Sequence, residues 1–146
     1  MKYWISITLP EIGTAGMEFP YGGIALFKDF FGIEGSLVYA QNYGAAWNLL
    51  EDHPEVLFIL RLILIGFLFV SFFRTDGWLK RFCLSLILVG ALGNIFDTIV
   101  RGHVVDMFYF VFFGYSYPVF NVADIAIAGG VILLCFLPKP VAATSA

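Results

Sequence analysis

The chain has 146 residues, of which 60% are hydrophobic and 13% are charged, and its mean hydropathy is +0.89. A water-soluble domain is about 45–50% apolar and ~25% charged, so the composition indicates one compact integral membrane domain over residues 1–146. The net charge of −3, without a basic stripe or a nucleic-acid-reading motif, excludes nucleic acid as an expected partner.

Residues 1–54 do not contain a membrane-spanning segment, because glycines, prolines and acids interrupt the apolar runs. Phe27, Phe30 and Phe31 are expected to lie on the bilayer surface as a short amphipathic helix. Residues 36–41 predict a strand, and the Asn-Tyr-Gly sequence that follows predicts a turn. This first part is therefore expected to be a small β-rich, extracytoplasmic segment.

Three strongly apolar segments follow, and they predict a bundle of three transmembrane helices over residues 55–137. The first, residues 56–73, would span about 27 Å at 1.5 Å per residue, close to the thickness of the hydrocarbon core. The second covers residues 82–99. The third runs from residue 124 to 137 and is expected to extend back towards residue 120. We expect an α-helical membrane protein with a small β-rich part outside the membrane.

The charges between the first two segments give the expected orientation. Arg74, Lys80 and Arg81 outnumber the single acid of that link, Asp76. Positively charged loops stay in the cytoplasm, so the first 54 residues and the 101–123 loop should lie on the outer face. Acids of the second and third segments then gather near the outer boundary of the membrane.

Two aspartates, Asp106 and Asp124, lie at that boundary, where a carboxylate next to hydrocarbon is costly and needs a reason. Two carboxyl groups held together can share one proton and activate a water molecule, as in aspartic peptidases. Asn94 and Asn121 can donate hydrogen bonds that orient these carboxylates, because an unpaired buried amide is unfavourable. For Asp97, a structural role and a functional role both stay open.

No competing chemistry stands out in the sequence. It has no Ser–His or Cys–His set, no metal-type spacing and no phosphate-binding loop, so neither a metal nor another cofactor is expected. Cys83 and Cys135 are expected to be buried, reduced thiols. Arg61, the single charge in the first apolar segment, is expected either to pair with a carboxylate or to extend towards the membrane surface.

Four short motifs in a fixed order resemble a known family. They are residues 42–47 (NYGAAW), 93–97 (GNIFD), 102–106 (GHVVD) and 118–124 (PVFNVAD). Their order and spacing are similar to those of lipoprotein signal peptidase, also called signal peptidase II, over roughly residues 30–137. One such motif is weak evidence, whereas four in order are specific.

The resemblance implies a multi-pass aspartic peptidase of the bacterial inner membrane, with its active site near the outer face. Such an enzyme removes the signal peptide from prolipoproteins that carry a diacylglyceryl group, and it cuts just before the lipid-modified cysteine. The family's catalytic dyad maps onto Asp106 and Asp124. Its supporting or substrate-contacting positions map onto Asn42, Asn94, Asp97 and Asn121. The implied partners are the lipid-modified substrate and membrane lipid, and a monomer is expected.

Two departures from the family pattern keep alternatives open. The family has four membrane helices, and the first of them is expected to be missing from this sequence. The family also commonly has Arg after the aspartate of its second motif; here Thr98 follows Asp97, and Arg101 is not at the matching position, so a compensating charge for Asp97 is not assured. One alternative is a truncated or degenerate, non-catalytic homologue that binds lipopeptides. Another is a small proton-coupled carrier, although carriers place their acids near the midplane.

Overall fold

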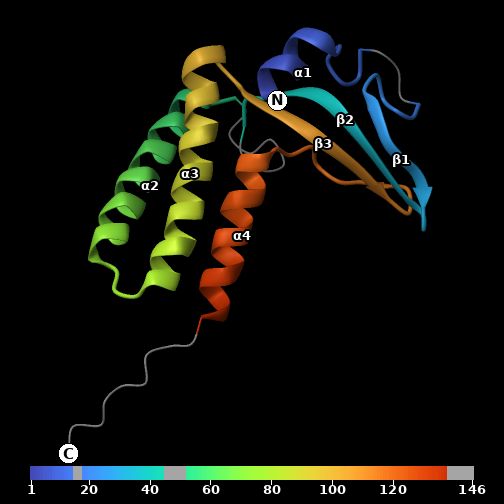
Figure 1. The fold of residues 1–146 in the computed structure, drawn as a ribbon. Helices are drawn as coiled ribbons and strands as arrows, with labels where there is room; N and C mark the ends of the chain where they lie inside the picture. The colour runs from blue at the N-terminus through green and yellow to red at the C-terminus, as the bar shows by residue number, and fades with distance from the viewer. Residues whose placement is uncertain (15–17, 45–51, 138–146) are drawn as a thin grey trace, which may run out of the picture.

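The computed structural model describes residues 1–14, 18–44 and 52–137. Figure 1 shows a group of long helices next to a twisted sheet, with a short helix lying across the sheet. In chain order the elements are α1 (Lys2–Thr8), β1 (Ile24–Phe30), β2 (Ile33–Asn42), α2 (Pro54–Arg74), α3 (Trp78–Arg101), β3 (Val104–Phe112), β4 (Tyr115–Ser116) and α4 (Val122–Phe136).

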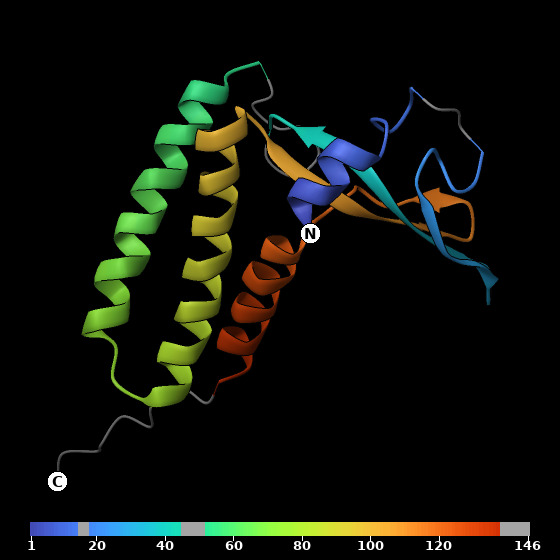
Figure 2. The ribbon, with the colours of Figure 1, turned by 45° about the horizontal axis from the view of Figure 1, so that its top comes forward.

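All three apolar segments are helical, as the sequence predicts, and α3 lies between α2 and α4 in both views of the ribbon (Figure 2). Helices α2 and α3, with 21 and 24 residues, are long and apolar enough to cross a membrane. Most of the large apolar side chains of α2 are exposed, which suits contact with lipid better than contact with water. Helix α4 has 15 residues, so its crossing of the membrane stays a prediction.

Glycines allow α3 and α4 to approach closely at two levels. A Cβ atom on Gly90 of α3 would lie 2.5 Å from the carbonyl oxygen of Ala123. A Cβ atom on Gly130 of α4 would lie 2.8 Å from the carbonyl oxygen of Cys83. Small residues at such contacts let helix backbones pack against each other, and here they hold α4 against α3 both at its first turn and further along, at Gly130.

The four strands form one sheet in the order β1-β2-β3-β4, with antiparallel neighbours. In the β2–β3 register, Ala40 lies opposite Asp106 and Asn42 lies opposite Val104. Because side chains alternate along a strand, Asp106 points to the opposite face from its fully buried neighbours Val105 and Met107. The sheet thus directs one carboxylate of β3 towards the three long helices.

The expected amphipathic helix at Phe27, Phe30 and Phe31 is wrong. Phe27 and Phe30 belong to β1, and Phe31 with Gly32 forms the turn into β2. Both turn residues have positive φ, +52° and +78°, which is the backbone geometry of a tight two-residue hairpin. The hairpin lets β1 pair with β2, and this pairing overrides the local apolar spacing.

The predicted strand at residues 36–41 is confirmed and lies within β2. The predicted turn after it is also confirmed, because the Gly44 backbone N–H donates a hydrogen bond to Asn42 Oδ1 over 3.0 Å. The rest of that motif, residues 45–47, lies outside the described residues.

Candidate active site

Asp106 lies in the middle of a set of amide donors. Its Oδ2 accepts a hydrogen bond from Asn42 Nδ2 over 2.9 Å, and its Oδ1 accepts one from Asn121 Nδ2 over 2.6 Å. The residue is only 2% exposed. Both carboxylate oxygens are therefore held in place from two different elements, β2 and the start of α4.

Asp124 is positioned by the beginning of α4. Asn121 is the N-cap residue of this helix, and its side-chain oxygen accepts hydrogen bonds from the backbone N–H groups of Ala123 and Asp124. In return, Asp124 Oδ2 accepts a hydrogen bond from the Asn121 backbone N–H over 2.9 Å. This reciprocal capping box fixes the carboxylate at the helix N-terminus, where a negative charge is favourable.

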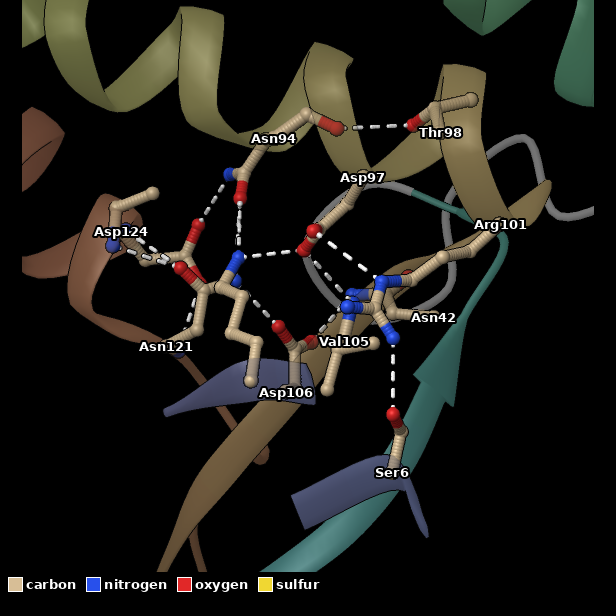
Figure 3. Close-up of polar contacts among 12 residues, drawn as sticks. Ser6, Asn42, Asn94, Asp97, Thr98, Arg101, Val105, Asp106, Asn121 and Asp124 are labelled. Carbon is tan, nitrogen blue, oxygen red and sulfur yellow. Dashed lines mark hydrogen bonds and ion pairs between the residues drawn. The ribbon is translucent and has the colours of Figure 1, made fainter. Parts of the chain in front are cut away.

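Two asparagines connect the carboxylates, as Figure 3 shows. Asn94 of α3 donates from Nδ2 to Asp124 Oδ1 over 2.9 Å, and its Oδ1 accepts from Asn121 Nδ2 over 3.1 Å. Asn121 therefore contacts Asp106 with its side chain and Asp124 with its backbone. The two predicted aspartates are brought together, with a single residue between them in the hydrogen-bond network.

Burial raises the pKa of the Asp106 carboxyl above its ordinary value. The hydrogen bonds from Asn42 and Asn121 oppose this shift, and the negative charge of Asp124 adds to it. A carboxyl group with a raised pKa next to a second acid can retain a proton at a pH where an isolated aspartate is ionised.

A cavity of about 220 Å³ contains this pair. Its polar walls are Asp106, Asp124, Asn42, Asn94 and Arg61, and Val104 and Phe120 are among its apolar walls. A larger cavity of about 760 Å³ lies elsewhere on the sheet and is lined by neither aspartate of the pair. Within residues 1–14, 18–44 and 52–137, no group of His, Cys, Asp or Glu has the geometry to hold a metal ion.

The sequence matches the family model described as signal peptidase (SPase) II over residues 1–137. The chain belongs to the signal peptidase II family. It is 46% identical over 102 residues to the lipoprotein signal peptidase of Caldicellulosiruptor bescii, covering 70% of this chain and 65% of that protein. It is 43% identical over 113 residues to that of Haemophilus ducreyi, covering 71% and 70%. The resemblance inferred from the four motifs is confirmed.

The fold supports the same assignment. A solved structure described as a bacterial membrane enzyme superposes with a TM-score of 0.73 at 33% identity, covering 91% of this chain and 74% of that one. A second, similarly described structure gives a TM-score of 0.69 at 32% identity. This chain spans about two thirds of the length of the first lipoprotein signal peptidase that it matches.

Asp97 has compensating charges, although this signal peptidase II homologue has Thr98 where the family commonly has Arg. Lys2 Nζ lies 2.6 Å from Asp97 Oδ2, and Arg101 Nε lies 3.7 Å from Asp97 Oδ1. The Val105 backbone N–H also donates to Asp97 Oδ2 over 3.3 Å. The doubt about the charge of Asp97 is thereby resolved, because one cation comes from the next helical turn and the other from α1.

Asp97 differs from the other predicted site residues in its contacts. The three asparagines of the motifs, Asn42, Asn94 and Asn121, each donate to a carboxylate of the pair. The hydrogen bonds of Asp97 run instead to Lys2 and to the start of β3. Asp97 therefore supports the strand that carries Asp106 and is not one of the residues lining the cavity.

Arg61 takes neither of its two expected roles. Its Nη2 donates to the carbonyl oxygen of Gly44 over 2.8 Å, and its Nη1 approaches Thr98 Oγ1 at 3.5 Å. The guanidinium group thus turns from α2 towards the cavity and holds the segment that follows Asn42. The sequence signal for this position is a lone arginine in an otherwise apolar membrane helix, whereas Lys2 gives no comparable signal.

Proposed function

We propose that this signal peptidase II homologue is an aspartic endopeptidase that removes signal peptides from diacylglyceryl-modified bacterial prolipoproteins. The cut would fall just before the lipid-modified cysteine. The observation that carries the proposal is the link through Asn121, which hydrogen-bonds to both Asp106 and Asp124. These two aspartates line the same cavity. The names of the related proteins supply the substrate class.

The proposed reaction needs one proton and one negative charge on the pair. The ionised carboxylate takes a proton from a water molecule, whose oxygen attacks the scissile carbonyl carbon. The protonated carboxyl group polarises the carbonyl oxygen by donating a hydrogen bond to it. When the tetrahedral intermediate collapses, the C–N bond breaks and the amine of the lipid-modified cysteine receives a proton. The raised pKa of Asp106 suits this single-proton state.

We also propose a location and an orientation. The protein would lie in the bacterial inner membrane with α2, α3 and α4 as membrane helices and the sheet on the outer side. The positively charged link between α2 and α3, which contains Lys80 and Arg81, would be cytoplasmic. The pair lies towards the opposite end of α3 from this link, and this separation supports the proposed position near the outer face. Membrane lipid would surround a monomer.

The test replaces each acid by its neutral isostere. Asp106→Asn and Asp124→Asn should each lower cleavage of a diacylglyceryl-modified precursor in membranes by on the order of 10²–10⁴-fold, because a general acid–base group is lost. Asp76→Asn, an exposed change in the α2–α3 link, is the matched control and should leave cleavage unchanged.

Wild-type cleavage by either site variant would contradict the proposed dyad. If the wild-type chain bound the lipopeptide but cleaved nothing, the alternative of a non-catalytic lipopeptide-binding homologue would replace the proposal. Binding is measured with the same lipidated peptide, so the two outcomes are separated in one preparation.

A further inference from the structure

Helix α1 packs on β2 and β3 of the sheet, and its first residues also reach the site. Arg101 holds the helix by donating from Nη1 to Ser6 Oγ over 2.8 Å, and its guanidinium lies 5.9 Å from the centre of the Tyr3 ring. Ile5, on the same helix, is fully buried. These contacts fix the first turn of α1 next to the end of α3 (Figure 3).

From this position Lys2 contacts the network behind the pair of acids. Its Nζ donates to Asp97 Oδ2 over 2.6 Å and lies 3.5 Å from Asn94 Oδ1. The Lys2 side chain is 21% exposed and that of Asp97 is 6% exposed, so water screens the ion pair weakly. Lys2 is separated from these partners by more than 90 residues of sequence.

The contact with Asn94 determines which way its amide points. Asn94 Oδ1 faces two donors, Lys2 Nζ and Asn121 Nδ2, so its Nδ2 must face Asp124. If the amide turned over, its NH₂ group would face the Lys2 ammonium and Asp124 would lose a donor. A cation at this position therefore favours the one orientation that hydrogen-bonds Asp124.

We propose that Lys2 is a positioning residue for the Asp106–Asp124 pair and acts through Asp97 and the Asn94 amide. This inference rests on the proposed peptidase function. Lys2 is not among the residues that line the cavity, and it hydrogen-bonds to Asp97 and Asn94 instead of to Asp106 or Asp124. Its roles are to neutralise Asp97, which fixes the start of β3, and to orient Asn94.

The charge of Lys2 also acts on the pair at a distance. The charged groups that act on Asp106 are Lys2 from α1, Arg61 from α2 and Asp124 from α4. On α3, Asp97 pairs with Lys2 and with Arg101. The positive charge of Lys2 lowers the pKa of Asp106, against the stronger effect of burial. Its removal should therefore raise the pKa of Asp106 further.

The experiment compares Lys2→Met, which removes the charge at similar length, with Lys2→Arg, which keeps it. Lys28→Met, at an exposed lysine of β1, is the matched control. In the full chain in membranes, Lys2→Met should lower kcat by up to about 100-fold with little change in KM, since misplacement of catalytic groups mainly affects the chemical step. The pH–rate profile should shift to higher pH. Lys2→Arg should retain most of the activity.

Carbonyl ¹³C NMR of aspartate-labelled protein gives a second readout that does not require cleavage. Signals are assigned with Asp106→Asn and Asp124→Asn, and the titration of the pair is compared between wild type and Lys2→Met. A double variant, Lys2→Met with Asp97→Asn, removes both charges, so it keeps a folded protein available for the titration if Lys2→Met alone fails to fold.

The two readouts separate the proposals. A wild-type pH profile and titration in folded Lys2→Met would overturn the positioning role. A titration that is shifted in Lys2→Met, together with a wild-type chain that cleaves nothing, would support the positioning role and overturn the proposed function. A shift in both readouts, together with rescue by Lys2→Arg, supports both.

Discussion

Asn121 donates a hydrogen bond from Nδ2 to Oδ1 of Asp106 over 2.6 Å, although Asn121 begins α4 and Asp106 lies in β3. The same side chain caps α4 through its oxygen. One fully buried residue therefore stabilises a helix and orients a carboxylate of the sheet. These two functions can be separated, because each uses a different atom of the amide.

Asn121→Ser should separate them by experiment. Serine is a good N-cap residue, so α4 keeps a side-chain acceptor, but the shorter side chain cannot donate to Asp106. We expect most of the thermal stability in detergent to remain, while cleavage of a lipidated precursor falls by on the order of 10-fold or more. Asn121→Ala should lose the same activity and a further ~0.5–2 kcal/mol of stability. Equal stability of the two variants would contradict the capping role.

The packing of α3 on α4 can be tested with two neighbouring glycines. Gly130→Ala would place a methyl group 2.8 Å from the Cys83 carbonyl oxygen, which should cost about 1–3 kcal/mol through overpacking. Gly129→Ala meets nothing within 4 Å and should be neutral or stabilising by roughly 0.5–1 kcal/mol, because alanine favours a helix. Thermal unfolding in detergent measures both. Similar effects of the two changes would show that the contact at Gly130 is unimportant.

Arg61 offers a test of the guanidinium group that enters the cavity from α2. Arg61→Met should lower cleavage by about 10-fold or more, because the Gly44 carbonyl loses its donor and the segment after Asn42 is less well held. Arg74→Met, an exposed change at the end of the same helix, is the control.

The proximity of Arg61 Nη1 to Thr98 Oγ1 suggests a rescue of that variant. Thr98→Arg in the Arg61→Met background would return a guanidinium group from α3 to the same region, at the position where the family commonly has arginine. We expect partial recovery of cleavage. No recovery, with both proteins folded, would mean that the α2 position itself is required.

The raised pKa of Asp106 predicts a pH dependence of stability. The folded state binds the proton of the Asp106 carboxyl group more tightly than the unfolded state, in which the pKa has its ordinary value of 3.8. By linkage, the stability that this tighter proton binding contributes is fully present below pH 3.8 and is lost as the pH rises through the folded-state pKa. The unfolding free energy of the wild type should fall across this window, relative to that of Asp106→Asn. If the unfolding free energies of the wild type and Asp106→Asn changed in parallel with pH, this result would contradict a raised pKa of Asp106.

The helices and the strand β2 could be predicted from sequence because they depend on local properties. Runs of about 18 apolar residues require helix in a membrane, whatever their neighbours, since every backbone hydrogen bond must be satisfied internally. The hairpin at Phe31 and Gly32 could not be predicted in the same way. Its backbone has positive φ at both positions, which is stabilised only once β1 has β2 to pair with.

The acids and the asparagines of the site could be identified from sequence, because few other residues in the apolar half of the chain are polar. The four motifs indicated the family, and the family match confirmed it. Their contacts with one another were not predictable. Asn42 donates a hydrogen bond to Asp106, and Asn94 donates one to Asp124. These pairings depend on the β2–β3 register and on how α4 is aligned along α3.

The sequence by itself determined the class of protein, its apolar helices and the pair of acids. The composition indicates a membrane environment directly, and the short motifs identify the residues of the candidate site. Only the tertiary structure decided which groups neutralise and orient those acids. Lys2 meets Asp97 across 95 positions of sequence, and Arg61 meets Gly44 across a helix boundary. Such contacts depend on how whole elements pack, and no local pattern in the sequence carries that information.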